Sequence, residues 1–373
     1  MMKRTPLYER HVALRSKLVD FAGWEMPIQY SGVVDEYRHV REAAGLFDVS
    51  HMGRVRVSGS GALAFLQRVT TNNVAAIPIL GSQYGMVCNP SGGIKDDIFV
   101  YRVKADEFLL CVNASNRAKI VAWLHEQHTA ADTCAIHDES EALAQLALQG
   151  PSSAKILDTL GLTDIMALKP RTVLPAMLHG VTCLISRTGY TGEPGWELYV
   201  PARIATRVWD DLMTAGAAVN LKAAGLGSRD LLRLEMAYLL YGNDISEETT
   251  PLEANAGWVV DFNKGDFIGR ARLDEQRSQG VERRLVAFEL LEKAVPRHGF
   301  AAHACGTSAA ARKPIGEVTS GNLSPLLQKG IGLAYVGAAH AALGTRIEIE
   351  IRDKMIPAVI VQPPFYRRPK AAR

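Results

Sequence analysis

Alternation of hydrophobic and polar positions predicts the strands of this chain, and these strands fall into three groups. Period-two alternation predicts half-buried strands in the first group, at residues 54–58, 94–103 and 108–113. Apolar residues at helical spacing predict helices around them, at residues 33–46, 62–69 and 117–128. This order, with a hairpin between the second and third strands, predicts an α+β domain of split βαβ type.

The second and third groups differ in the kinds of elements that they contain. The second again mixes strands with helices, and its elements are predicted at residues 143–148, 152–160, 181–187, 196–200, 204–215 and 228–240. After about residue 284 only short strands separated by Gly and Pro follow, at residues 285–291, 314–319, 330–336, 346–351 and 358–361. Their spacing is typical of a small β-barrel or sandwich that forms a separate domain.

Composition and charge argue against several classes of function. A chain of 373 residues exceeds one ordinary core, and 47% hydrophobic with 22% charged residues is typical of a globular protein. The net charge of +3 gives no support for nucleic-acid or membrane binding. The ten histidines show no metal-ligand spacing, so we expect no metal. A start without a signal-peptide pattern predicts a bacterial cytoplasmic protein, or a mitochondrial matrix protein if the chain is a mature eukaryotic one.

Two adjacent carboxylates, Asp96 and Asp97, stand where a turn runs into the strand 94–103. Side chains alternate along a strand, so Asp97 shares a face with Phe99 and Tyr101, and Asp96 takes the other face. One carboxylate therefore points among apolar groups, which is costly unless it is paired or used chemically. The alternative is that both carboxylates cap a turn at the surface.

Glu197 and Arg229 are two further candidates for contact with a ligand, and each follows glycines in the sequence. Three glycines in the loop 187–195 precede the strand that carries Glu197, and they would let the backbone approach a ligand. A carboxylate such as Glu197 can accept two parallel hydrogen bonds from an amidine-like edge; the alternative is an outward residue on a half-exposed strand. With Ser228 as N-cap, Arg229 lies at a helix start and could grip a carboxylate, or could belong to a solvated face.

Taken together, these segments resemble the T-protein family of the glycine cleavage system, which are tetrahydrofolate-dependent aminomethyltransferases. The resemblance covers nearly the whole chain in order. The matching stretches are Thr5–Tyr8, Phe21–Trp24, Leu46–Met52, Gly92–Asp97, Ala147–Pro151, Arg187–Glu193, Arg229–Glu235 and Leu240–Ile245.

The resemblance implies an α+β fold of three domains in a cloverleaf. Residues 1–53 and 143–280 would form a discontinuous folate-binding domain, and residues 54–142 a second domain that carries the catalytic carboxylate. Both would be split-βαβ, ferredoxin-like α/β domains. Residues 281–373 would form a distorted, jelly-roll-like β-barrel.

The resemblance also assigns site residues. It implies that Asp97 is catalytic and that Glu197 and Arg229 contact the folate. The remaining residues would line the cavity: Met52, Tyr84, Tyr101, Asn113, Tyr190, Tyr238 and Arg367. Relatives carry an arginine near the C-terminal end of the chain. Here Arg367 and Arg368 are both candidates for it, and we choose Arg367. Only one hairpin register puts Asn113 beside Asp97.

The implied reaction moves a one-carbon unit from the aminomethyl-lipoyl arm of the H-protein to tetrahydrofolate, and ammonia leaves. The implied partners are therefore the H-protein, which carries the lipoate, and tetrahydrofolate as acceptor substrate, without metal, nucleic acid or membrane. Two alternatives are a folate-dependent demethylase and a folate-binding module for iron–sulfur protein maturation. Relatives of the latter type carry a cysteine where this chain has Asp266.

Overall fold

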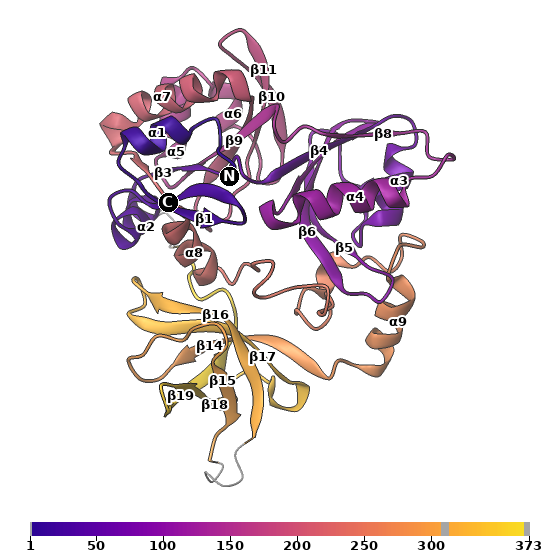
Figure 1. Ribbon diagram of the computed structural model, residues 1–373, viewed down its shortest axis with the longest axis vertical. Helices are drawn as coiled ribbons and strands as arrows, with labels where there is room; N and C mark the ends of the chain where they lie inside the picture. Colours follow the sequence, from indigo (N-terminus) through magenta and orange to yellow (C-terminus); the bar gives the residue numbers. More distant parts are fainter. Residues whose placement is uncertain (1, 307–312, 369–373) are drawn as a thin grey trace. The chain divides into compact units, whose positions relative to one another are not determined.

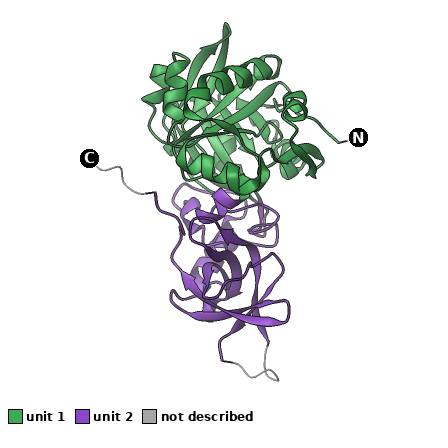
Figure 2. Cartoon of the chain, turned by 90° about the vertical axis from the view of Figure 1, so that its left-hand side faces the viewer, with its two compact units in different colours: residues 1–87, 96–230 green, residues 88–95, 231–373 purple. Residues whose placement is uncertain are grey.

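The computed structural model describes residues 2–306 and 313–368, and the chain divides into two compact units (Figures 1 and 2). The first unit comprises residues 1–87 and 96–230, and the second comprises residues 88–95 and 231–373. The first unit holds two mixed α/β layers, and the second holds a closed barrel.

The first sheet of unit 1 has six strands in the order β10-β11-β12-β9-β3-β13. These are β3 (Gly45–Asp48), β9 (Leu143–Gln149), β10 (Val173–Leu178), β11 (Val181–Ser186), β12 (Gly195–Pro201) and β13 (Lys222–Ala223). Helices cover one face and share a hydrophobic core with the strands: α5 (Ser153–Thr159), α6 (Thr163–Met166) and α7 (Ala205–Gly216). Because β12 lies antiparallel between β9 and β11, this is a split βαβ arrangement.

The second sheet of unit 1 has the order β5-β6-β7-β4-β8. Its strands are β4 (Gly53–Ser58), β5 (Ser82–Cys88), β6 (Ile94–Lys104), β7 (Glu107–Val112) and β8 (Ala135–Asp138). The helices α3 (Ala62–Val69) and α4 (Arg117–Gln127) each bury one apolar side. Since β7 lies between β4 and β6 and is antiparallel to both, this sheet too has split βαβ topology.

The two sheets of unit 1 meet through an aromatic cluster. Along β12, Trp196 and Leu198 point into the core under the helices, whereas Tyr199 points to the opposite face. There Tyr199 packs with Tyr101 of β6 and Leu109 of β7. The strand β12 is therefore buried on both faces, and its second face is directed toward the other sheet.

The remaining elements of unit 1 are a short two-stranded sheet and flanking helices. These are α1 (Tyr8–Ala13), β1 (Lys17–Phe21), β2 (Trp24–Gln29) and α2 (Val33–Glu42). Short 3₁₀ helices of the chain are η1 (Val74–Ala76), η2 (Ala114–Asn116), η3 (Ala202–Ile204), η4 (Ala217–Val219), η5 (Gly257–Val259) and η7 (Ala338–His340).

Unit 2 contains the closed barrel β14-β17-β16-β15-β18-β19. Its strands are β14 (Arg283–Leu290), β15 (Ala301–Ala304), β16 (Pro314–Ser324), β17 (Lys329–Gly337), β18 (Arg346–Ile351) and β19 (Lys354–Val361). Aliphatic side chains and Phe288 fill its interior. The helix α9 (Arg270–Gln279) precedes the barrel, and α8 (Leu226–Glu235) runs from unit 1 into unit 2.

The predicted fold class is confirmed, with two α/β layers of split βαβ type and a barrel, whereas the three domain boundaries stay a prediction. Three element predictions were wrong. The helix predicted at 228–240 ends at Glu235, because the chain turns at Ala237, whose φ is 53°. The helix predicted at 33–46 ends at Glu42, because residues 45–48 instead form β3 and pair with β9 inside the sheet. Ser228 is not an N-cap: α8 begins at Leu226, and the Ser228 hydroxyl donates to the carbonyl of Gly225 (2.9 Å). In the described part of the chain, no helix is long and apolar enough to cross a membrane.

Candidate active site

The adjacent carboxylates occupy contrasting environments at the start of β6. Asp96 is fully buried and accepts hydrogen bonds from the Asn113 main-chain N–H (3.0 Å), Asn113 Nδ2 (2.8 Å) and Asn116 Nδ2 (2.6 Å). The surface-cap alternative is therefore wrong for Asp96. Burial and the nearby charge of Asp97 raise the pKa of Asp96 to about 7.

Asp97 is half-buried and is held from two sides. Asn113 Nδ2 donates to Asp97 Oδ1 (2.7 Å), and the Tyr84 hydroxyl donates to Oδ2 (2.9 Å). The hairpin register pairs Phe99 with Cys111, which is the register that brings Asn113 beside Asp97. Desolvation and the Asp97 carboxylate raise the pKa of Tyr84 well above its usual range, so Tyr84 remains a donor.

A row of aromatic rings leads from Asp97 to the first sheet. The Tyr84 ring lies 5.9 Å from the Phe99 ring, which stacks on Tyr101 at 5.8 Å between centroids. Tyr101 meets Tyr199 edge-on at 5.4 Å, and the Tyr199 hydroxyl donates to that of Tyr101 (3.0 Å). Met52 packs against the same cluster. The structure thus brings Tyr84, Tyr101 and Met52 close to one another, and their role as folate contacts stays a prediction.

Glu197 lies at the far end of this aromatic row. Its Oε2 accepts hydrogen bonds from Thr188 Oγ1 (2.5 Å) and the Tyr101 hydroxyl (3.4 Å), and its Oε1 accepts one from Gln145 Nε2 (3.2 Å). All three partners are neutral donors. Glu197 is buried, so the alternative of an outward-facing residue is wrong. A carboxylate has about four lone-pair sites, so Glu197 retains capacity for the N–H edge of a ligand.

Arg229 and Tyr190 form a cation–π pair in unit 1. The guanidinium carbon of Arg229 lies 4.7 Å from the centroid of the Tyr190 ring. No carboxylate in the described residues forms an ion pair with Arg229. Tyr190 lies close enough to Tyr84 to contribute to its raised pKa. Arg229 is half-buried in this position and is available to an anionic group.

Two of the three glycines in the loop 187–195 lie against the side chain of Gln149. A Cβ at Gly189 would lie 2.0 Å from Gln149 Oε1, and a Cβ at Gly195 would lie 2.3 Å from Gln149 Nε2. Thr191 donates to Gln149 Oε1 (2.8 Å), and Gln149 Nε2 donates to the carbonyl of Thr188 (3.2 Å). These two glycines therefore make room for Gln149, and the predicted approach of the loop backbone to a ligand stays a prediction.

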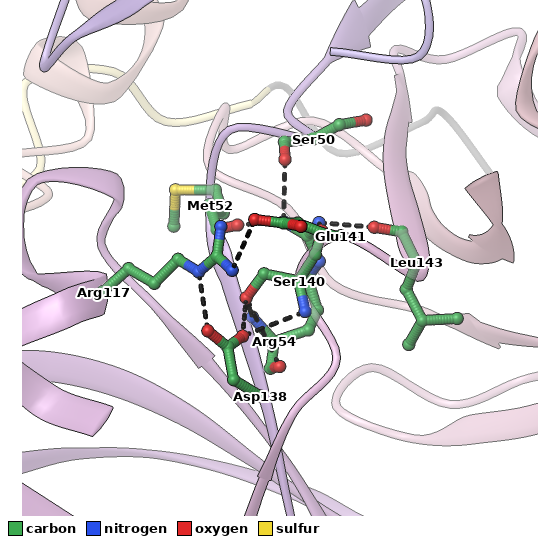
Figure 3. Close-up of polar contacts among 8 residues, drawn as sticks. All are labelled: Ser50, Met52, Arg54, Arg117, Asp138, Ser140, Glu141 and Leu143. Carbon is green, nitrogen blue, oxygen red and sulfur yellow. Dashed lines mark hydrogen bonds and ion pairs between the residues drawn. The ribbon is translucent and has the colours of Figure 1, made fainter. Parts of the chain in front are cut away.

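Arg54 fixes the segments that connect the two sheets of unit 1 (Figure 3). Its guanidinium is fully buried and donates to the main-chain carbonyls of Ser50 (2.9 Å), Met52, Ser140 and Leu143. Burial lowers the pKa of Arg54 to about 10, which leaves it charged at neutral pH. Because one carbonyl belongs to Met52, this contact positions a predicted site residue.

Two predicted site residues, Tyr238 and Arg367, belong to unit 2. Tyr238 is 37% exposed, and Arg367 is exposed near the end of the described chain. Both stay predicted folate contacts. In the same unit, Arg233 is buried and forms an ion pair with Asp244 (2.7 Å).

Comparison with known proteins now decides the family. Residues 7–264 match the family model of the GCVT N-terminal domain, and residues 283–367 match that of the glycine cleavage T-protein C-terminal barrel domain. The chain belongs to the glycine cleavage T-protein family of aminomethyltransferases.

Individual relatives are similar to this T-protein family member along nearly its full length. The aminomethyltransferase of Bacillus subtilis (strain 168) is 44% identical over 370 residues, covering 99% of this chain and 100% of the relative. That of Desulforamulus reducens is 43% identical over 367 residues, covering 98% and 99%. The crystal structure of glycine cleavage system aminomethyltransferase T from Bartonella henselae superposes with a TM-score of 0.90 at 33% identity, covering 98% of both chains. The predicted family is thus confirmed, and aminomethyl transfer is favoured over both alternatives.

This T-protein family uses tetrahydrofolate as a substrate and acts with the H-protein. In the described residues, no three His, Cys, Asp or Glu side chains come together as a metal site. Gln145 and Tyr199 of the Glu197 network were not predicted as site residues, although the sequence carries a signal for each. Gln145 interrupts an apolar strand, and Tyr199 lies two positions after Glu197 and therefore on its face.

Proposed function

We propose that this chain transfers the one-carbon unit of an aminomethyl group from the lipoyl arm of the H-protein to tetrahydrofolate. The products are 5,10-methylenetetrahydrofolate, ammonia and the dihydrolipoyl H-protein. The observation that carries the proposal is the association, within unit 1, of the Asp97 carboxylate with an aromatic row that ends at the Glu197 carboxylate. A bacterial cytoplasmic location is part of the proposal, since the relatives named above are bacterial.

Asp97 acts on the reacting carbon in this proposal. When ammonia departs from the S–CH₂–NH₃⁺ arm, the methylene carbon gains cationic character, which an ionised carboxylate stabilises. The two folate nitrogens form C–N bonds to this carbon as the C–S bond breaks. Of their two protons, one ends on the sulfur and one is released. Asp97 accepts a proton from the attacking nitrogen, and Asn113 and Tyr84 hold the carboxylate for this step.

The other predicted residues bind the folate substrate in this proposal. Glu197 accepts the N–H edge of the pterin, because its present partners leave lone pairs available. The rings of Tyr84, Tyr101 and Tyr190, with Met52, provide apolar and stacking surface for the folate. Arg229 binds a folate carboxylate. Tyr238 and Arg367 complete the set of predicted contacts.

The experiment that tests this function mixes the purified protein with the aminomethylated lipoyl H-protein, with and without tetrahydrofolate. We expect ammonia release at full rate only when tetrahydrofolate is present. Release at the same rate without folate would contradict the proposal. A parallel screen of small methylated compounds, with the H-protein omitted, tests the demethylase alternative and should give no folate-dependent turnover.

A further inference from the structure

His51 is a buried histidine that has no part in the proposed reaction. It is 2% exposed, and its Nδ1 is sealed from solvent. Among residues 2–306 and 313–368, the His51 ring finds no hydrogen-bond partner. Buried polar groups in folded proteins are nearly always paired, so such an exception requires a reason.

Hydrogen bonds on both sides of His51 hold the main chain of the turn that carries it. Asp48 Oδ1 accepts a hydrogen bond from the Ser50 main-chain N–H (2.9 Å). Arg54 donates to the carbonyls of Ser50 and Met52, the two residues that flank His51 (Figure 3). The turn therefore holds the His51 backbone in place while its ring remains without a hydrogen-bond partner among the described residues.

The surroundings of His51 connect it to the candidate site. Its chain neighbour Met52 packs against the aromatic cluster, and its ring meets Phe21 edge-on at 5.5 Å. Burial lowers the pKa of His51 to about 3; the Asp48 carboxylate opposes this, and the Arg229 and Arg54 guanidinium groups add to it. His51 is consequently neutral at pH 7 and carries one ring N–H.

We infer that His51 is a further ligand-binding residue, whose Nε2–H donates a hydrogen bond to a carbonyl or carboxylate oxygen of the reduced folate. The inference rests on the proposed function, which supplies the folate. Since no acceptor faces the sealed Nδ1, the proton is better placed on Nε2. The positive charge of Arg229 nearby favours an electron-rich oxygen as the partner. Folate offers such oxygens on its pteridine ring, its benzamide and its glutamate.

Two substitutions of His51 test the inference. Gln keeps an N–H donor near the position of Nε2, whereas Leu keeps the bulk and removes the donor. Titration calorimetry with 5-formyltetrahydrofolate, without the H-protein, should show about tenfold weaker binding for His51→Leu and a change below about threefold for His51→Gln. The thermal midpoint of His51→Leu should not fall, because the substitution removes an unpaired buried polar group.

Two results would overturn the inference. One is wild-type affinity in His51→Leu, and the other is equal loss in both variants with a matching fall in thermal midpoint. If the wild type binds no reduced folate, the proposed function fails, which is distinguishable from a failure at His51 alone. A second titration with 5-formyltetrahydropteroate, which lacks glutamate, locates the oxygen. A persisting tenfold loss assigns it to the pteridine or benzamide, and an abolished loss assigns it to the glutamate.

Discussion

The carboxylates of Asp96 and Asp97 show how one residue step along a strand separates two chemical roles. Asp96 lies on the face of β6 that is fully buried, with Ile98 and Val100, and neutral amides satisfy it. Asp97 lies on the half-buried face beside Tyr84. Strand alternation predicted that one of the two would face apolar groups, but it could not decide which one serves chemistry. The family resemblance supplied that choice, which stays a prediction.

The raised pKa of Asp96 predicts a pH dependence of stability. An acid whose pKa is raised on folding holds its proton more tightly in the folded state. Its contribution to stability is therefore complete below the ordinary pKa near 4 and is lost as the pH rises through about 7. In Asp96→Asn this titration is absent. We expect the free energy of unfolding of the wild type to fall relative to that of Asp96→Asn between about pH 5 and pH 8.

Urea denaturation at a series of pH values measures this difference. Asp106→Asn is a matched control, because Asp106 is an exposed carboxylate in the turn between β6 and β7. The control should follow the wild type at every pH. Parallel stability curves for the wild type and Asp96→Asn would show that Asp96 does not titrate in this range.

At the scale of elements, the turn that leads into β6 depends on close packing at Gly93. A Cβ at this position would lie 1.9 Å from the main-chain oxygen of Glu247 and 2.8 Å from Asn89 Nδ2. Asn89 also accepts the main-chain N–H of Gly93 through Oδ1 (2.9 Å). Gly93 is thus required for steric reasons, since its φ is not in the left-handed region.

We predict that Gly93→Ala lowers the free energy of unfolding by about 1–3 kcal/mol, because backbone must move to admit the methyl group. The start of β6 would move with the turn, so turnover should fall by more than the loss of folded protein explains. Ser91→Ala, at an exposed position of the same turn, should change neither quantity. Thermal unfolding and ammonia release on the same samples check both effects, and wild-type turnover in Gly93→Ala would refute the coupling.

Elements with a clear period were predictable, and elements without one were not. The helix α3 at Ala62–Val69 and the strand β18 at Arg346–Ile351 have the predicted limits. In contrast, β3 at Gly45–Asp48 is a short run that is buried throughout and shows no alternation, and the helical pattern of 33–46 covers its first two residues. The role of the glycine loop was also missed, because no local pattern shows that Gln149 fills the space beside it.

At the scale of the whole molecule, the candidate site is assembled from residues far apart in the sequence. The contact between Tyr101 and Glu197 joins the two sheets of unit 1 across 96 positions. Periodicity identifies which face of each strand is buried, but it does not say which sheets face one another. The ordered motifs of the family supplied that information for unit 1. For Tyr238 and Arg367 in unit 2 the assignment rests on the resemblance alone.

The central claim is that the Asp97 carboxylate carries the one-carbon transfer. The most direct measurement is the rate of ammonia release from the aminomethylated H-protein at saturating tetrahydrofolate, for the wild type, Asp97→Asn and the control Asp106→Asn. We predict a loss of about 10²-fold or more in Asp97→Asn, with 5-formyltetrahydrofolate affinity largely retained and the control unchanged. A wild-type rate in Asp97→Asn would contradict the account.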